Sequence, residues 1–259
     1  MRASEVAIIT LICFVVSFAI SISDTLYKYH RYGITGAPCV YIEQTKKFIG
    51  MSTEPCGDVY SYPLPELKWY NMGFYSLAGF ILYITNSVFV TFFIIFPILF
   101  LMIPVGIMLI IWKLFHNPEL LLLALPLFFQ PSFIIEIAAH FTRLLVLLFL
   151  TYGLYLLLVA IQKKNHWMVA IATVLLLCMF FMHRTPIKDE LFLYPKYFLM
   201  FLPIPMAYLF QKLWNRKPKL ASLLLYSIVI SFSAFFLSTC IFEKVLLKVI
   251  VWEIGGWPI

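Results

Sequence analysis

The sequence GFYSLAGFILYITNSVFVTFFIIFPILFLMIPVGIMLIIW occupies residues 73–112 and is apolar almost throughout. At about 40 residues it is too long for one perpendicular crossing of a bilayer and long enough for two. Asn86 and Ser87 are suited to a turn between two membrane helices. Pro97 and Pro104 instead favour one long, kinked run with a re-entrant part, because proline removes a backbone donor and breaks a straight helix. The sequence leaves both arrangements open.

The composition of the whole chain also indicates a membrane protein. Of its 259 residues, 63% are hydrophobic and 12% are charged, whereas soluble domains are about a quarter charged. The mean hydropathy is +0.96. These values exclude a soluble enzyme, a nucleic-acid binder and a disordered tail. The lysines and arginines that give the formal charge of +7 lie in short loops, so they fit orientation in a membrane better than a polyanionic partner.

We predict an all-α, polytopic bundle of about seven transmembrane helices that forms one domain over residues 1–259. The segment 119–137 carries Pro126, Gln130, Pro131 and Glu136, so a full span and a broken or re-entrant helix fit it equally well. The tail 243–259 is amphipathic and is either an interfacial helix or a packed C-terminal helix. The remaining predicted spans, the first of them an uncleaved helix, are 6–22, 144–161, 167–182, 191–210 and 220–242.

Residues 24–68 form the only long hydrophilic segment, and their many glycines and prolines predict a loop with one short helix. Its tyrosines suit a surface that lies against lipid headgroups. Two of the five cysteines, Cys39 and Cys56, lie in this loop, and the others lie in apolar runs. In an oxidising compartment a Cys39–Cys56 disulfide closes a loop of roughly 16 residues, which is worth about 3 kcal/mol in the chain-entropy model.

The charges separate by side of the membrane. One side carries short, almost purely basic loops, which mark the cytoplasm; its residues are Arg2, Lys163, Lys164, Lys212, Arg216, Lys217 and Lys219, with Glu5 as the acid. The other side collects Asp24, Glu43, Glu54, Asp58, Glu66, Glu136, Asp189, Glu190, Glu243 and Glu253. Lys113 and Glu119 remain unassigned. We therefore predict a multi-pass integral membrane protein whose loop 24–68 is extracytoplasmic.

Three constellations can carry chemistry, and the first is Asp24, directly after the first span. A carboxylate at the outer membrane surface can act as a general base or hold a divalent cation that carries a phosphate. The alternative is a charge that anchors the end of the helix in the interface.

The second constellation is Glu136, His140 and Arg143, spaced i, i+4 and i+7 so that one helical face carries all three. Such a face can bind an anionic headgroup or shuttle a proton. The alternative is an ion-paired interfacial turn that leads into the next span.

The third constellation is the densely charged segment 183–197. Its cations can hold a phosphate or pyrophosphate, and its acids can orient a hydroxyl or a metal. A plain solvated loop is an equal alternative. The residues concerned are Arg184, Lys188, Lys196, Asp189 and Glu190.

In the layout of the chain, Asp24 follows the first span, a long outer loop and several spans come next, and the segment 183–197 then precedes FLMFLPIPMAYLF. This layout resembles that of polytopic glycosyltransferases of the GT-C fold class. That resemblance implies transfer of a sugar from a lipid-phosphate carrier at the outer face, with Asp24 as base or metal ligand. The paired acidic motif of that class is absent from this sequence.

Residues 8–84, through PCV, CGDVYSY and GFYSLAGFILY, are similar to the first half of the vitamin K epoxide reductase family. This similarity implies that loop cysteines relay electrons to a membrane CxxC and a quinone. Here the CxxC is missing and Cys178 stands alone in its span, so the cycle cannot close on this chain. Cys39 and Cys56 are then either remnants of such an electron relay or a pair that faces the substrate.

We predict a membrane enzyme, or an enzyme-like protein, that handles a lipid-linked or anionic lipid substrate at the outer face. The candidate residues are the three constellations together. The alternatives are a non-catalytic subunit of a membrane complex, whose loops dock partner membrane subunits, and thiol-disulfide exchange through Cys39 and Cys56. A channel or transporter also remains open, although no charged residue lies securely at mid-membrane, where a coupled ion pathway usually has one.

Overall fold

The computed structural model of the chain describes residues 2–32, 37–53, 72–130, 141–182 and 199–241. Within these ranges the chain consists of helices and connecting turns, with no strand. Four helical segments of the described chain are long and apolar enough to cross a membrane, namely Ala3–Ser23, Val90–Phe115, Phe141–Lys163 and Pro218–Ser238. The predicted all-α membrane fold is thereby confirmed, while the count of seven spans remains a prediction.

The first helix, α1, runs from Ala3 to Tyr32 and so continues past Asp24. The segment that follows Asp24 contains no glycine or proline before Gly33, so nothing in it stops a helix. Asp24 therefore lies within a helix, and it directly follows the candidate membrane span Ala3–Ser23. The polar loop also contains the short helix that the sequence predicts, α2, from Ala37 to Phe48.

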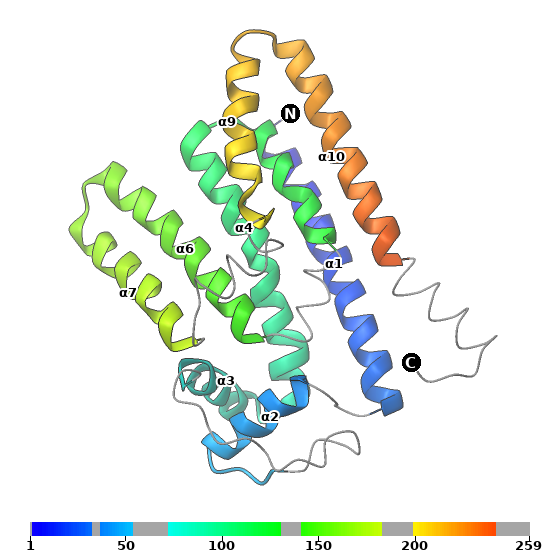
Figure 1. Cartoon of the computed structure of the whole chain (residues 1–259), viewed down its shortest axis with the longest axis vertical. Helices are drawn as coiled ribbons and strands as arrows, with labels where there is room; N and C mark the ends of the chain where they lie inside the picture. The colour runs from blue at the N-terminus through cyan, green and yellow to red at the C-terminus, as the bar shows by residue number, and fades with distance from the viewer. Residues whose placement is uncertain (1, 33–36, 54–71, 131–140, 183–198, 242–259) are drawn as a thin grey trace, which may run out of the picture.

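The long apolar stretch is divided at Asn86, which has a left-handed backbone (φ 47°). Helix α3 (Met72–Thr85) precedes this turn, and a π-helix, η2 (Val90–Ile95), follows it and leads into α4 (Phe96–Phe115). The expected turn is therefore present. At 14 residues, however, α3 is only about 21 Å long, shorter than the roughly 30 Å hydrocarbon core. Figure 1 shows α3 beside α2 at one end of the bundle.

Pro97 explains the π-helical turn before α4. The N–H of Phe96 donates to the carbonyl of Thr91, five residues back, so the turn just ahead of Pro97 is wider than in an α-helix. A wider turn relieves the clash between a proline ring and the carbonyl four residues earlier. Pro104 lies inside α4, which continues through it to Phe115.

The segment after α4 is η3, a 3₁₀-helix from Pro118 to Phe129. At about 2 Å per residue, its 12 residues cover roughly 24 Å, most of the thickness of a bilayer core. It starts where the side chain of Asn117 accepts a hydrogen bond from the N–H of Glu119. Its residues from Leu122 to Phe129 are all buried, so η3 is an interior helix of the bundle.

The C-terminal half contains α6 (Phe141–Lys163), α7 (His166–Met182), a short 3₁₀ turn η5 (Leu199–Phe201), α9 (Pro203–Trp214) and α10 (Pro218–Ile241). Helices α6 and α7 pack closely, because a Cβ at Gly153 would lie 2.7 Å from Cδ2 of Leu176. The described part of the predicted span 191–210 is helical, because η5 leads through Leu202, which has right-handed helical backbone angles, into α9. Pro203 is the first residue of α9, a position that proline favours. The span as a whole remains a prediction.

The bundle has two ends (Figure 1). At one end lie the start of α1 and the turns α4–η3, α6–α7 and α9–α10. We call it the basic end, and it carries Arg2, Lys113, Lys163, Lys164, Lys212, Arg216, Lys217 and Lys219. The opposite end, which we call the α2 end, contains α2, α3, the C-terminus of α1 and the N-termini of α4 and α6. The sequence did not assign Lys113 and Glu119 to a side of the membrane. Both lie near the basic end, because the C-terminus of α4 and the N-terminus of η3 meet there (Figure 1).

Candidate functional site

Helix α2 is polar yet buried. The side chains of Glu43 and Gln44 are 5% and 3% exposed, and Thr45 is fully buried. Burying polar groups costs free energy unless hydrogen bonds replace those lost to water. The loop helix is thus docked into the α2 end of the bundle and does not lie free on its surface.

Hydrogen bonds hold α2 in place. The hydroxyl of Tyr75 in α3 donates to Oε1 of Gln44, and the hydroxyls of Tyr41 and Thr142 are 3.3 Å apart, which joins α2 to α6. Within α2, Nζ of Lys46 lies 2.7 Å from Oε1 of Glu43. The carboxylate of Glu43 is therefore buried with a cation beside it, as a charge inside a protein must be.

A cluster of buried aromatic rings lies next to these polar contacts. Phe141, the first residue of α6, is at its centre. The rings around it, with centroids 5.4–6.3 Å away, belong to Tyr41, Phe74, Phe92, Phe96 and Phe100. These residues come from α2, α3, η2 and α4, so the cluster joins four elements to the start of α6. It gives the polar residues of the α2 end a rigid support.

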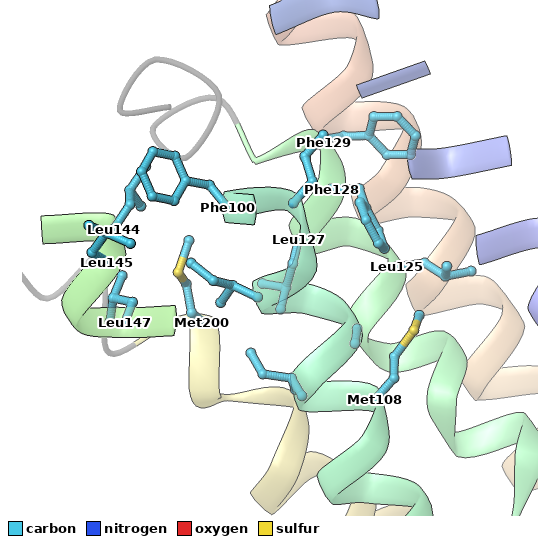
Figure 2. Packing of buried hydrophobic residues seen from close by; sticks show 14 of the residues in the cluster. Phe100, Met108, Leu125, Leu127, Phe128, Phe129, Leu144, Leu145, Leu147 and Met200 are labelled. Carbon is cyan, nitrogen blue, oxygen red and sulfur yellow. The ribbon is translucent and has the colours of Figure 1, made fainter. Parts of the chain in front are cut away.

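Arg143 lies in the first turn of α6, directly after Thr142, and is half-buried with interactions of its own. One turn further along the same face is Leu147, which belongs to the same buried cluster as Met200 of η5. Figure 2 shows Met200 near Leu145 and Leu147. η5 is the first described element after the segment 183–198, so the described chain resumes near Leu145 and Leu147 of α6 (Figure 2).

Other members of these two constellations lie outside the described residues, and nothing in the structure tests them. They are Glu136, His140, Arg184, Lys188, Asp189, Glu190 and Lys196.

The first constellation is also described in part. On α1, Ser17 and Ser21 are buried, and Oγ of Ser17 donates to the carbonyl of Phe128 at 2.6 Å. Position 24 is seven residues after Ser17 and three residues after Ser21. The helical register therefore places this position on the face of α1 that meets η3. The side chain of Asp24 itself lies outside the described residues.

Gln130 ends η3 two residues after Phe128. Its Oε1 is buried and has no hydrogen-bond donor within the described structure. A buried acceptor without a donor costs about 1–3 kcal/mol, so such groups usually serve a water or a ligand. Gln130 therefore adds an unsatisfied polar group near the face of α1 that carries position 24.

Cys39 is 6% exposed on α2. The free thiols among the described residues are Cys13 and Cys178, and Cys39 is not one of them. Its predicted partner, Cys56, lies outside the described residues. The described ranges contain no group of three or more His, Cys, Asp or Glu that could hold a metal ion. The acids proposed to hold a divalent cation lie outside that search.

Four residues of this site were not predicted from the sequence: Glu43, Gln44, Tyr75 and Gln130. The available signal was the segment between Gly36 and Gly50, which has no helix breaker after its first turn and thus predicts a helix. Nothing in its composition indicates that the helix is buried. Comparison with known proteins adds nothing here, because no protein family, curated protein or solved structure matches this chain.

Proposed function

We propose that this is a multi-pass membrane protein that acts on a lipid-phosphate-linked or anionic lipid substrate at the α2 end, with that end outside the cytoplasm and the basic end inside. The observation that carries the proposal is the gathering of Arg143 and of the buried Glu43 and Gln44 at one end of the bundle (Figure 1). The unsatisfied Gln130 ends η3 beside the middle of α1, where Ser17 contacts Phe128. The short basic turns are at the other end, as the positive-inside rule requires.

Arg143 is suited to hold a phosphate. A guanidinium forms charge-assisted, often bidentate hydrogen bonds to phosphate oxygens. The aromatic cluster around Phe141 fixes the start of α6 and so fixes the position from which Arg143 acts.

Glycosyl transfer is the reaction that best uses Asp24 together with Arg143. The acceptor hydroxyl attacks the anomeric carbon of the lipid-linked sugar, and its proton passes to the carboxylate of Asp24. The bond from the anomeric carbon to the phosphate oxygen breaks, and its electron pair leaves with the lipid phosphate. Arg143 stabilises the negative charge that develops on that phosphate.

A disulfide between Cys39 and Cys56 is part of the proposal. It would fix α2 to the remainder of the outer loop and favour the docked position of the loop. The deep burial of Cys39 supports a structural bond, because thiol-disulfide exchange needs an accessible sulfur.

The test uses the full chain in phosphatidylcholine vesicles that contain a polyprenyl phosphate, and then a polyprenyl-phosphate sugar. Arg143→Gln is expected to weaken retention of the polyprenyl phosphate by about 10-fold to 100-fold, because a hydrogen bond to a charged group is worth roughly 1.5–3 kcal/mol. Asp24→Asn is expected to retain the lipid but to lose release or transfer of the sugar.

The matched control is Lys212→Gln, which removes a cation at the basic end and is expected to change neither result. Equal retention by the wild type, Arg143→Gln and Lys212→Gln would refute the phosphate site. Undiminished sugar transfer by Asp24→Asn would refute the role of Asp24. A wild-type chain that binds no polyprenyl phosphate, but is retained by a second membrane protein, would favour the non-catalytic subunit instead.

A further inference from the structure

A groove of about 460 Å³ runs along α1, between α1, α4 and η3. It lies on the side of α1 where large apolar side chains such as Leu11 are exposed. Its lining includes Ala3, Ala7 and Phe14 of α1, Met102 and Met108 of α4, and Leu121 of η3. Because α1 and α4 both qualify as membrane spans, this groove opens toward the hydrocarbon of the bilayer.

The dimensions of the groove fit a single hydrocarbon chain. From Ala3 to Phe14 it is roughly 16 Å long at 1.5 Å per residue. All of the empty space in and above the groove, about 860 Å³, corresponds over that length to a width of roughly 8 Å at most, whereas a helix with its side chains is about 10–12 Å wide. The groove is thus too narrow for the helix of a partner protein.

The chemistry of the lining fits the same occupant. Thr10 is the polar side chain among the lining residues, and its hydroxyl already donates to the carbonyl of Val6 at 2.8 Å. Its Oγ1 also lies 3.6 Å from the sulfur of Met108. The groove therefore offers no unsatisfied polar group to a ligand, as is appropriate for an alkyl chain.

The mouth of the groove carries groups that suit a phospholipid headgroup. Arg2, which is exposed, directly precedes Ala3. Trp112 follows Met108 at i+4 and Val105 at i+7, so it continues the groove-lining face of α4 toward the basic end. Its ring is 39% exposed and lies 6.0 Å from the ring of His116. Tryptophan is enriched at the level of lipid headgroups, and the arginine can pair with a phosphate. Two acids lie near this mouth. The carboxylate of Glu5 accepts from the backbone N–H of Arg2, and the carboxylate of Glu119 accepts from the hydroxyl of Tyr226 at 2.8 Å.

We propose that this groove is a binding site for an anionic glycerophospholipid of the leaflet at the basic end. One acyl chain occupies the groove between α1, α4 and η3, and the phosphate lies at Arg2 and Trp112. This site is separate from the proposed function, because it lies toward the opposite end of the bundle from Arg143.

The experiment uses the full chain in phosphatidylcholine vesicles with a minor fraction of phosphatidylglycerol that carries a photoactivatable acyl chain. Peptide mapping is expected to find the crosslinks concentrated on residues 3–14 and 102–108. Ala7→Trp fills the groove and is expected to lower these crosslinks by about tenfold, because a tryptophan takes the volume of the chain. Ala170→Trp, the same change at an exposed position of α7, is the matched control and is expected to have no effect. Arg2→Gln is expected to remove the preference for phosphatidylglycerol over an equally labelled phosphatidylcholine.

Crosslinks spread evenly over all lipid-exposed helices would overturn the proposal, as would equal crosslinking of Ala7→Trp and the wild type. Crosslinks from groove positions to a second protein chain would show that a partner protein occupies the groove, and would contradict the argument from the width of the groove. If Ala7→Trp fails to fold, the wild-type map and the Arg2→Gln comparison still decide the outcome.

Discussion

Replacing Phe141 by alanine is expected to destabilise the α2 end more than any other single truncation in the aromatic cluster. The ring is fully buried and contacts five other rings. In a bilayer the transfer of apolar surface from water contributes little, because lipid is as apolar as the core. The cavity remains, and about 100 Å³ at roughly 24 cal/mol per Å³ gives about 2.4 kcal/mol. Ring pairs contribute further, but contributions of residues in mutual contact are not additive. We therefore expect a total loss of about 3–5 kcal/mol, the range found when a buried phenylalanine is replaced by alanine.

The assay is reversible unfolding in mixed micelles with increasing sodium dodecyl sulfate, followed by tryptophan fluorescence. The matched control is Phe80→Ala, in which a ring of α3 that is 63% exposed is removed, and its expected change is below about 0.5 kcal/mol. If both variants lose the same free energy of unfolding, the aromatic cluster is not the support of the α2 end and the reasoning from its packing is refuted.

Two further variants test neighbouring contacts. Gly79→Ala is expected to lower the free energy of unfolding by about 1–2 kcal/mol, because its Cβ would lie 2.5 Å from Cγ2 of Ile49 and overpacking outweighs the gain in helix propensity. Adding Ile49→Ala to the same chain should restore most of this loss. If the effects of the two substitutions simply add, the contact is disproved. Gln130→Met is expected to stabilise the lipid-free protein by about 1 kcal/mol while weakening polyprenyl phosphate retention, because it removes a buried acceptor without a donor. The control is Gln211→Met, which removes a similar acceptor near the basic end and should leave polyprenyl phosphate retention unchanged. If Gln130→Met instead lowers the stability of the protein, Oε1 of Gln130 already has a hydrogen-bond partner.

The hydrophobic pattern predicts the helices well where a long apolar run has no breaker. The runs 144–161 and 220–242 lie almost wholly within α6 and α10, and 167–182 lies within α7. Prolines mark the irregular segments, but they do not reveal the geometry that results. The π-helix before Pro97 and the 3₁₀-helix through Pro126 depend on which backbone hydrogen bonds the packed bundle can replace. Which hydrogen bonds form is decided by tertiary packing, so the local propensity of the sequence does not predict it.

The site is less predictable than the fold for a similar reason. Arg143 was identified from helical spacing, and the structure places it in α6, two residues after Phe141 at the centre of the aromatic cluster. The docking of α2 depends on partners from other elements of the chain, because Tyr75 hydrogen-bonds to Gln44 and Thr142 hydrogen-bonds to Tyr41. A polar helix in a loop has the same sequence signature whether it is docked or solvated, so pairings of this kind need the structure.

The most direct test of the proposed arrangement is the sidedness of the two ends. Ser52→Cys, exposed at the α2 end, and Lys163→Cys, exposed at the basic end, can be labelled with a membrane-impermeant maleimide on intact cells and on inverted vesicles, with the wild type as background. We expect Ser52→Cys to be labelled only on intact cells and Lys163→Cys only on inverted vesicles. Labelling of Lys163→Cys from outside, or of both positions from one side, would contradict an extracytoplasmic α2 end and the lipid-phosphate site proposed there.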